Sequence, residues 1–192
     1  MMRSLLILLA LLVTACSPPA HFNATDLTGS TTIGTDFSLP DQTGKLRRLS
    51  DFKGKVAIVF FGYTQCPDVC PTTLSTLRDV MTQLGPQAER VQVLFVTLDP
   101  QRDTPALLAQ YVPSFHPTFL ALRGDDAATG ATAQAFKVFY KKQPGSAPDI
   151  YSVDHSTGSY VYDPQGRLRL YVKYGDTAEH ITGDLKQLLA GK

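Results

Sequence analysis

Two cysteines separated by three residues, Cys66 and Cys70, are the side chains of this chain best suited to chemistry. On the first turn of a helix, their Cα atoms would lie about 6 Å apart, given the rise of 1.5 Å per residue. That distance suits a disulfide, and it also lets two thiolates meet at one metal ion. The partial positive charge at a helix N-terminus predicts thiol pKa values below the usual range. The same placement therefore serves both redox chemistry and metal binding.

A histidine far along the chain, His155, is the candidate third ligand. Two soft thiolates and one imidazole suit Cu(I), which tolerates low coordination, and they supply three of the ligands that Cu(II) takes. Structural zinc would need four protein ligands. Asp68 is close in sequence, but a carboxylate is a poor ligand for soft copper, and Asp154 is predicted to support the site from outside the ligand set. The spacing alone leaves open a disulfide with an unrelated surface histidine.

The N-terminal segment has the pattern of a bacterial lipoprotein signal. Arg3 precedes an unbroken apolar run over residues 5–13, shorter than the about 20 residues that cross a bilayer. The following Val-Thr-Ala-Cys resembles a lipobox, in which the thiol of Cys16 receives a diacylglycerol. The chain is accordingly predicted to have three parts, which are a signal peptide (1–15), a flexible tether (16–36) and a folded domain (37–192).

Composition and compartment narrow the function further. Of the 192 residues, 43% are hydrophobic, which is enough to build a core without disulfides. The net charge is +1 and the basic residues are scattered, so no nucleic-acid surface is expected. We expect the chain in the bacterial periplasm, anchored by lipid to a membrane, with the cytoplasmic membrane favoured. A disulfide between Cys66 and Cys70 would close a tiny loop and stabilise little, so the pair is better explained by chemistry.

The predicted elements place the cysteines and the histidine together. Residues 56–61 form an apolar run typical of a buried strand, and residues 72–84 have the apolar spacing of a helix. The loop 99–105 is predicted to form a turn and a helix cap. The whole order predicts an α/β, thioredoxin-like fold with an inserted strand–helix unit and an N-terminal β-hairpin. In that fold the loop carrying His155 lies beside the loop carrying the cysteines.

The residues around the pair resemble the Sco/SenC family of copper chaperones. The string Phe-Gly-Tyr-Thr-Gln-Cys-Pro-Asp-Val-Cys-Pro-Thr carries the resemblance, and further matches follow in order at residues 97–105, 115–117, 153–156 and 162–168. The resemblance implies one copper ion per chain, as Cu(I) or Cu(II), bound by Cys66, Cys70 and His155. Many relatives have histidine where this chain has Gln65, so a possible auxiliary ligand is missing here.

The resemblance also implies partners and leaves three functions to compare. Such proteins help to assemble the dinuclear copper centre of cytochrome c oxidase, which implies its copper-centre subunit as partner, with other periplasmic copper chaperones or thiol reductants beside it. The first interpretation is a copper-binding assembly factor rather than an enzyme with turnover. The second is a thiol–disulfide oxidoreductase or redox sensor that uses Cys66 and Cys70. A thiol peroxidase ranks last, because peroxiredoxins place threonine three residues before the reactive cysteine, where this chain has Tyr63 and Pro67.

Overall fold

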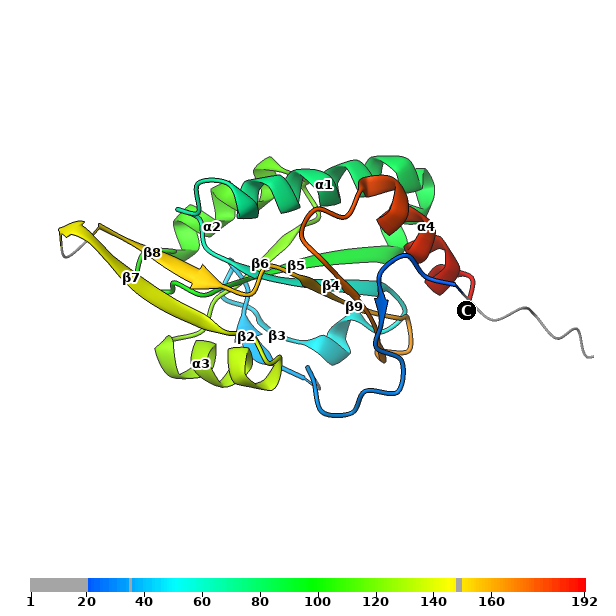
Figure 1. Cartoon of the computed structure of the whole chain (residues 1–192), viewed down its shortest axis with the longest axis horizontal. Coiled ribbons are helices and arrows are strands. Elements are labelled where there is room, and N and C mark those ends of the chain that lie inside the picture. Colours follow the sequence, from blue (N-terminus) through cyan, green and yellow to red (C-terminus); the bar gives the residue numbers. More distant parts are fainter. Residues whose placement is uncertain (1–20, 35, 148–149) are drawn as a thin grey trace, which may run out of the picture.

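The structure, a computed structural model, describes residues 21–34, 36–147 and 150–192. Its centre is a six-stranded sheet in the order β1-β10-β9-β4-β5-β6 (Figure 1). The strands of this sheet are β1 (Thr25–Asp26), β4 (Val56–Gly62), β5 (Val91–Thr97), β6 (Leu120–Leu122), β9 (Ser159–Tyr162) and β10 (Leu168–Val172). β4, β5 and β6 are parallel to one another, whereas β9 runs antiparallel to β4.

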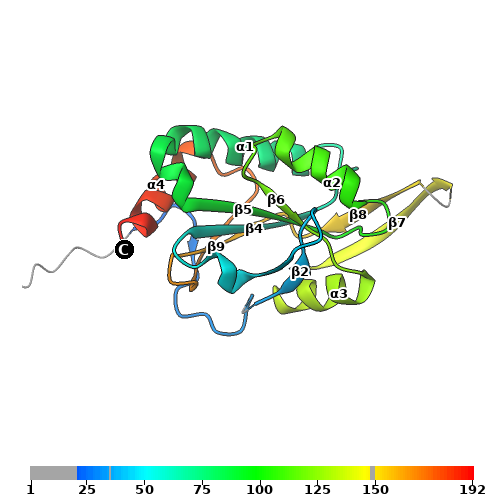
Figure 2. The ribbon, with the colours of Figure 1, turned by 180° about the vertical axis from the view of Figure 1, so that it is seen from behind.

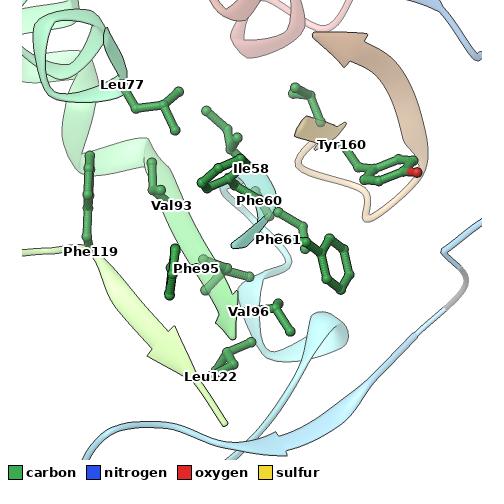
Figure 3. Close-up of a cluster of buried hydrophobic side chains, with 14 of the residues drawn as sticks. Ile58, Phe60, Phe61, Leu77, Val93, Phe95, Val96, Phe119, Leu122 and Tyr160 are labelled. Atoms are coloured by element: carbon green, nitrogen blue, oxygen red, sulfur yellow. The ribbon is translucent and has the colours of Figure 1, made fainter. Parts of the chain in front are cut away.

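The two central strands form because they can be covered on both faces. Every residue of β4 and β5 is buried, and their sequences are rich in β-branched and aromatic side chains. Their register aligns Phe60 with Phe95 and Gly62 with Thr97. Figure 3 shows the side chains that pack around these strands, with Phe119 and Tyr160 among them. The predicted strand over residues 56–61 is thus confirmed within one residue.

Helices cover both faces of the sheet. The helices α1 (Val69–Leu84), α2 (Pro105–Tyr111) and α4 (Ala178–Leu189) lie on one face, while α3 (Asp126–Ala135) lies on the other beside the hairpin β2 (Ser38–Pro40) and β3 (Leu46–Arg48) (Figures 1 and 2). Three short 3₁₀ helices lie between these elements: η1 (Leu49–Phe52) follows β3, η2 (Gly85–Arg90) follows α1 and η3 (Val112–Ser114) follows α2. The unit α2–β6 corresponds to the predicted insertion, and β2–β3 is the predicted N-terminal β-hairpin.

A second hairpin is the main difference from the sequence prediction. From the sequence alone we predict a helix over residues 127–140 and a loop over residues 141–148. In the structure, α3 ends at Ala135 and the chain then forms β7 (Tyr140–Ala147) and β8 (Ile150–His155). Lys137 has a positive φ of 57°, which stops the helix. The two strands pair only with each other and project from the body of the molecule (Figure 1). β7 is mostly solvent-exposed and only Val153 of β8 is buried, so the apolar alternation of the hairpin is too short to reveal it in the sequence.

The described part of the predicted tether lies against the folded domain. β1 pairs with β10, and the Asp184 carboxylate accepts hydrogen bonds from the backbone N–H of Asn23 and of Ala24, both at 2.9 Å. The carbonyl of His21 accepts a hydrogen bond of 3.0 Å from Gln187 near the end of α4. The folded region therefore begins upstream of residue 37. The predicted signal peptide and Cys16 lie outside the described residues, among which no helix is long and apolar enough to cross a membrane.

Candidate metal centre

The two cysteines lie where β4 passes into α1. Cys66 is in the connecting loop and is 9% exposed, whereas Cys70 is in the first turn of α1 and is fully buried. Both thiols are free, and the backbone N–H of Cys70 donates a hydrogen bond of 3.4 Å to the Cys66 sulfur. The loop and the first helical turn therefore hold the two sulfur atoms close together, as their spacing predicted.

His155 reaches the cysteines from the end of β8. Its Nε2 lies 3.8 Å from the Sγ of Cys70, and its Nδ1 lies 2.9 Å from the carbonyl oxygen of Val153. A carbonyl oxygen can only accept, so Nδ1 carries a proton in this bond, and in a neutral ring the lone pair is then on Nε2, which faces Cys70. The ring also packs edge-on against Tyr63, with 5.8 Å between centroids. The predicted approach of His155 is confirmed, although it comes from a strand end rather than from a loop.

Two predicted acidic neighbours point elsewhere. Asp154 accepts a hydrogen bond of 2.6 Å from the Gln143 side chain on the exposed hairpin, so the His155 ring takes its support from the Val153 carbonyl instead. Asp68 is exposed and accepts a hydrogen bond of 3.2 Å from the Thr72 hydroxyl. Asp154 and His155 are neighbours on β8, and neighbouring residues of a strand project to opposite faces. The Asp154 side chain therefore points away from the His155 ring.

The thiol of Cys70 differs from the sequence expectation. Its burial raises the pKa well above the usual thiol range, which outweighs the benefit of the helix N-terminus. The reason is that a buried thiolate loses its hydration, and the partial charge of one helix end does not replace that loss. In the metal-free protein this thiol therefore keeps its proton at neutral pH, and a metal that binds it must displace that proton.

The geometry admits a soft metal ion between sulfur and nitrogen. A zinc-sized ion bonded to sulfur at about 2.3 Å and to nitrogen at about 2.0 Å can join atoms up to about 4.3 Å apart. The 3.8 Å between Cys70 Sγ and His155 Nε2 falls inside that reach. Within the described ranges, no three His, Cys, Asp or Glu side chains already stand at coordinating distance of one point. Completing a trio of ligands with Cys66 would therefore need a shift of these side chains.

Comparison with known proteins identifies the family of this site. The sequence model of the SCO1/SenC family matches residues 25–190. The chain belongs to the SCO1/SenC family. A SCO2 homologue from Bos taurus mitochondria is 39% identical over 157 residues, which are 81% of this chain and 59% of that protein. The chain thus spans less than two thirds of that relative's length.

Solved structures of the SCO1/SenC family share the fold. The Bradyrhizobium japonicum ScoI structure with copper bound is 39% identical, with a TM-score of 0.76 over 82% of this chain and 99% of that one. The apo Sco1 structure from Thermus thermophilus is 41% identical, with a TM-score of 0.78 over 88% of this chain and 98% of that one. These matches confirm the predicted family and the thioredoxin-like fold.

The segment that leads to Cys66 is held by a buried carboxylate, that of Asp103, to which the sequence prediction assigned no role. Asp103 accepts hydrogen bonds from the backbone N–H of Thr64 at 3.1 Å, from the Thr64 hydroxyl at 2.6 Å and from the Thr97 hydroxyl at 2.5 Å. Burial raises the pKa of this carboxyl, although the three donors act in the opposite direction. The loop 99–105 was predicted only as a turn and cap. Thr104 does cap α2, but the same loop also anchors the segment that leads to Cys66.

Gly62 is a second residue beside the cysteines that the sequence prediction did not single out. A Cβ atom at this position would lie 2.7 Å from the Cys70 sulfur and 2.9 Å from the Phe95 ring. Glycine is therefore needed where the last residue of β4 passes the buried thiol. The signal available in the sequence was its place at the end of a buried strand, four residues before the first cysteine.

Proposed function

We propose that this chain binds one copper ion through Cys66, Cys70 and His155 and supplies it to the dinuclear copper centre of cytochrome c oxidase during assembly. The observation that carries the proposal is the 3.8 Å approach of His155 Nε2 to the buried Cys70 sulfur, across 85 residues of sequence. Family membership supports the choice of metal, because the similar ScoI of Bradyrhizobium japonicum has a structure with copper bound.

The donor set accounts for the choice of copper. Two thiolates and a neutral imidazole are soft to borderline ligands, which favour Cu(I) and also bind Cu(II). Copper would be the ion that the protein delivers, while the protein sets the ligand geometry and excludes water from the buried Cys70 sulfur. Each cysteine loses its proton when it becomes a ligand, and burial raises the pKa of Cys70. Copper affinity is therefore expected to increase with pH.

A second candidate function is thiol–disulfide exchange with the cysteines of a copper acceptor. It is favoured by the two free thiols, because Cys66 is the more exposed sulfur and lies beside the backbone of Cys70. The Cys66 thiolate would attack one sulfur of a partner disulfide and release the other as a thiolate. The Cys70 thiolate would then attack the Cys66 sulfur and release the partner's remaining sulfur. The protein would finish with one disulfide, the partner with two thiols, and no other oxidant would be required.

The proposal includes a location. The lipobox-like sequence ending at Cys16 supports attachment to a bacterial membrane through lipid, with the folded domain in the periplasm. The proposed partner is the copper-centre subunit of the oxidase, with other periplasmic copper chaperones or thiol reductants as donors. The scattered charges and net charge of +1 give no support for a nucleic-acid partner.

Copper titration of the reduced protein tests the proposal. The wild-type chain is expected to bind one Cu(I), and one Cu(II) with a sulfur-to-copper charge-transfer band. His155→Ala should weaken Cu(II) binding most, and the double variant Cys66→Ser, Cys70→Ser should lose both ions. His180→Ala is the matched control, because His180 is exposed on α4. Equal copper binding by the double cysteine variant would refute the site, and full oxidase assembly by His155→Ala would favour thiol exchange over copper delivery.

A further inference from the structure

We propose that Arg102 is a positioning residue that fixes His155 relative to the cysteine pair, an inference that rests on the proposed function. Among the described residues, Arg102 forms no hydrogen bond with Cys66, Cys70 or His155. It joins instead the two segments that carry them. The loop after β4 carries Cys66, and the hairpin β7–β8 carries His155 at the end of its second strand.

A single guanidinium nitrogen bridges these segments. Nη1 of Arg102 donates a hydrogen bond of 3.0 Å to the side-chain oxygen of Gln65 and one of 2.8 Å to the carbonyl oxygen of Tyr151. Gln65 directly precedes Cys66, and Tyr151 lies on β8, four residues before His155. The bridge therefore sets the spacing between the loop and the hairpin close to both proposed ligand groups.

The guanidinium is itself held rigidly. Its Nε donates to the carboxylate of Asp99, whose side chain is fully buried, and its Cζ lies 3.5 Å from the centre of the Tyr151 ring. The Tyr151 hydroxyl donates a hydrogen bond of 2.7 Å to the same Asp99 carboxylate. Lys142 of β7 approaches this carboxylate as well, at 3.8 Å. Tyr151 is thus fixed through its carbonyl, its ring and its hydroxyl by one Asp99–Arg102 pair.

The hairpin needs such a connection more than the cysteines do. Cys66 and Cys70 are separated by only three residues of one chain, and the buried strand and helix on either side hold them together. β7 and β8 form a separate two-stranded sheet outside the central one, as Figure 2 also shows. An isolated two-stranded hairpin is marginally stable in water. His155 is consequently the ligand whose position depends most on contacts such as those of Arg102.

Loss of the Arg102 bridge should resemble a partial loss of His155. Residues that orient metal ligands typically change metal affinity by 10- to 100-fold when mutated. For Arg102→Gln we expect copper binding about 10-fold weaker, with a shifted Cu(II) charge-transfer band. Arg102→Lys keeps the charge but cannot bridge Asp99, Gln65 and Tyr151 together, so it should be nearly as weak. Arg78→Gln is the control, because Arg78 forms an exposed ion pair with Asp79 on α1.

A double-mutant cycle separates positioning from general stabilisation. The four proteins are the wild type, Arg102→Gln, His155→Ala and the double variant, each measured for Cu(II) affinity by competition with a chelator. If Arg102 acts through His155, its substitution should cost less than about 2-fold once His155 is gone. Gln65→Ala, which removes one end of the bridge, gives a second measurement if Arg102→Gln does not fold, as judged by thermal unfolding.

The outcomes distinguish this inference from the proposed function. Wild-type copper affinity in both Arg102→Gln and Gln65→Ala would overturn the positioning role, and so would an equal loss with and without His155. Either result would leave the copper function standing. A wild-type protein that bound no copper would overturn the proposed function first, and the inference with it.

Discussion

Placing a methyl group on Gly62 should damage both the fold and the site. The added Cβ would lie 2.7 Å from the Cys70 sulfur, 2.9 Å from the Phe95 ring and 3.2 Å from the Phe60 ring. All three neighbours are fully buried, so none can move into solvent. Overpacking of this kind costs typically about 1–3 kcal/mol. For a domain of this size, a loss of about 2 kcal/mol lowers the melting temperature by about 4–8 °C.

Thermal unfolding of Gly62→Ala and Gly130→Ala measures this cost against a matched control. Gly130 lies within α3, and a Cβ there would meet only the Tyr140 hydroxyl, at an ordinary 3.5 Å. Because alanine is the better helix former by about 1 kcal/mol, Gly130→Ala should raise the melting temperature. Copper titration should also find Gly62→Ala weakened, since the Cys70 sulfur has to shift.

The role of the sulfur can be isolated in the same experiment. Cys70→Ala removes the atom nearest to the added methyl group, so Gly62→Ala should cost less stability in that background than in the wild type. A melting temperature for Gly62→Ala equal to that of the wild type would show that the site has room for a side chain. The packing argument would then be wrong. An identical cost with and without the sulfur would assign the clash to the Phe95 and Phe60 rings.

Two further predictions concern titrating groups. Alkylation of the reduced protein at neutral pH should label Cys66 before Cys70, because Cys70 is fully buried and its burial raises the thiol pKa. Mass spectrometry of partly labelled peptides measures the order, and labelling of Cys70 first would contradict the prediction. Burial alone would raise the pKa of Asp163, but hydrogen bonds from Arg167 and Arg169 outweigh it and hold the pKa below the usual 3.8. This carboxylate therefore stabilises the fold above that pH, and its contribution is lost as the pH falls through the lowered value. Asp163→Asn should lose stability at pH 7 and progressively less toward pH 2, in urea unfolding followed across that range; a loss of equal size at every pH would contradict the assignment.

The parts of the fold that bury apolar surface were predictable from sequence. An apolar run predicts the strand that ends at Gly62, and apolar residues at helical spacing predict the helix that carries Leu74 and Leu77. Burial of each element requires its pattern. The Thr104 cap was predictable because a hydroxyl before Pro105 has a specific local task. The hairpin β7–β8 was not, since exposed strands that pair only with each other need no apolar alternation.

The proposed ligands of the site could be named from the sequence, whereas the residues that support them could not. Cys66, Cys70 and His155 have side chains with distinctive chemistry, and the family motif named them together. Asp103 and Arg102 act through contacts across 37 to 49 residues of sequence, which no local pattern encodes. Their position offered one usable clue, because they follow β5, whose end lies beside the end of β4 at the same edge of the sheet. The raised pKa of Cys70 likewise depended on how deeply its thiol is buried.

The contact of His21 with α4 has a consequence for how the molecule is presented to its surroundings. His21 lies beside the last turns of α4, whereas the first turn of α1, with Cys70, lies at the opposite end of the molecule (Figures 1 and 2). The 16 residues of α1 alone separate these ends by about 24 Å. Under the proposed lipid attachment at Cys16, the end of the molecule that holds the two buried cysteines would therefore face away from the bilayer.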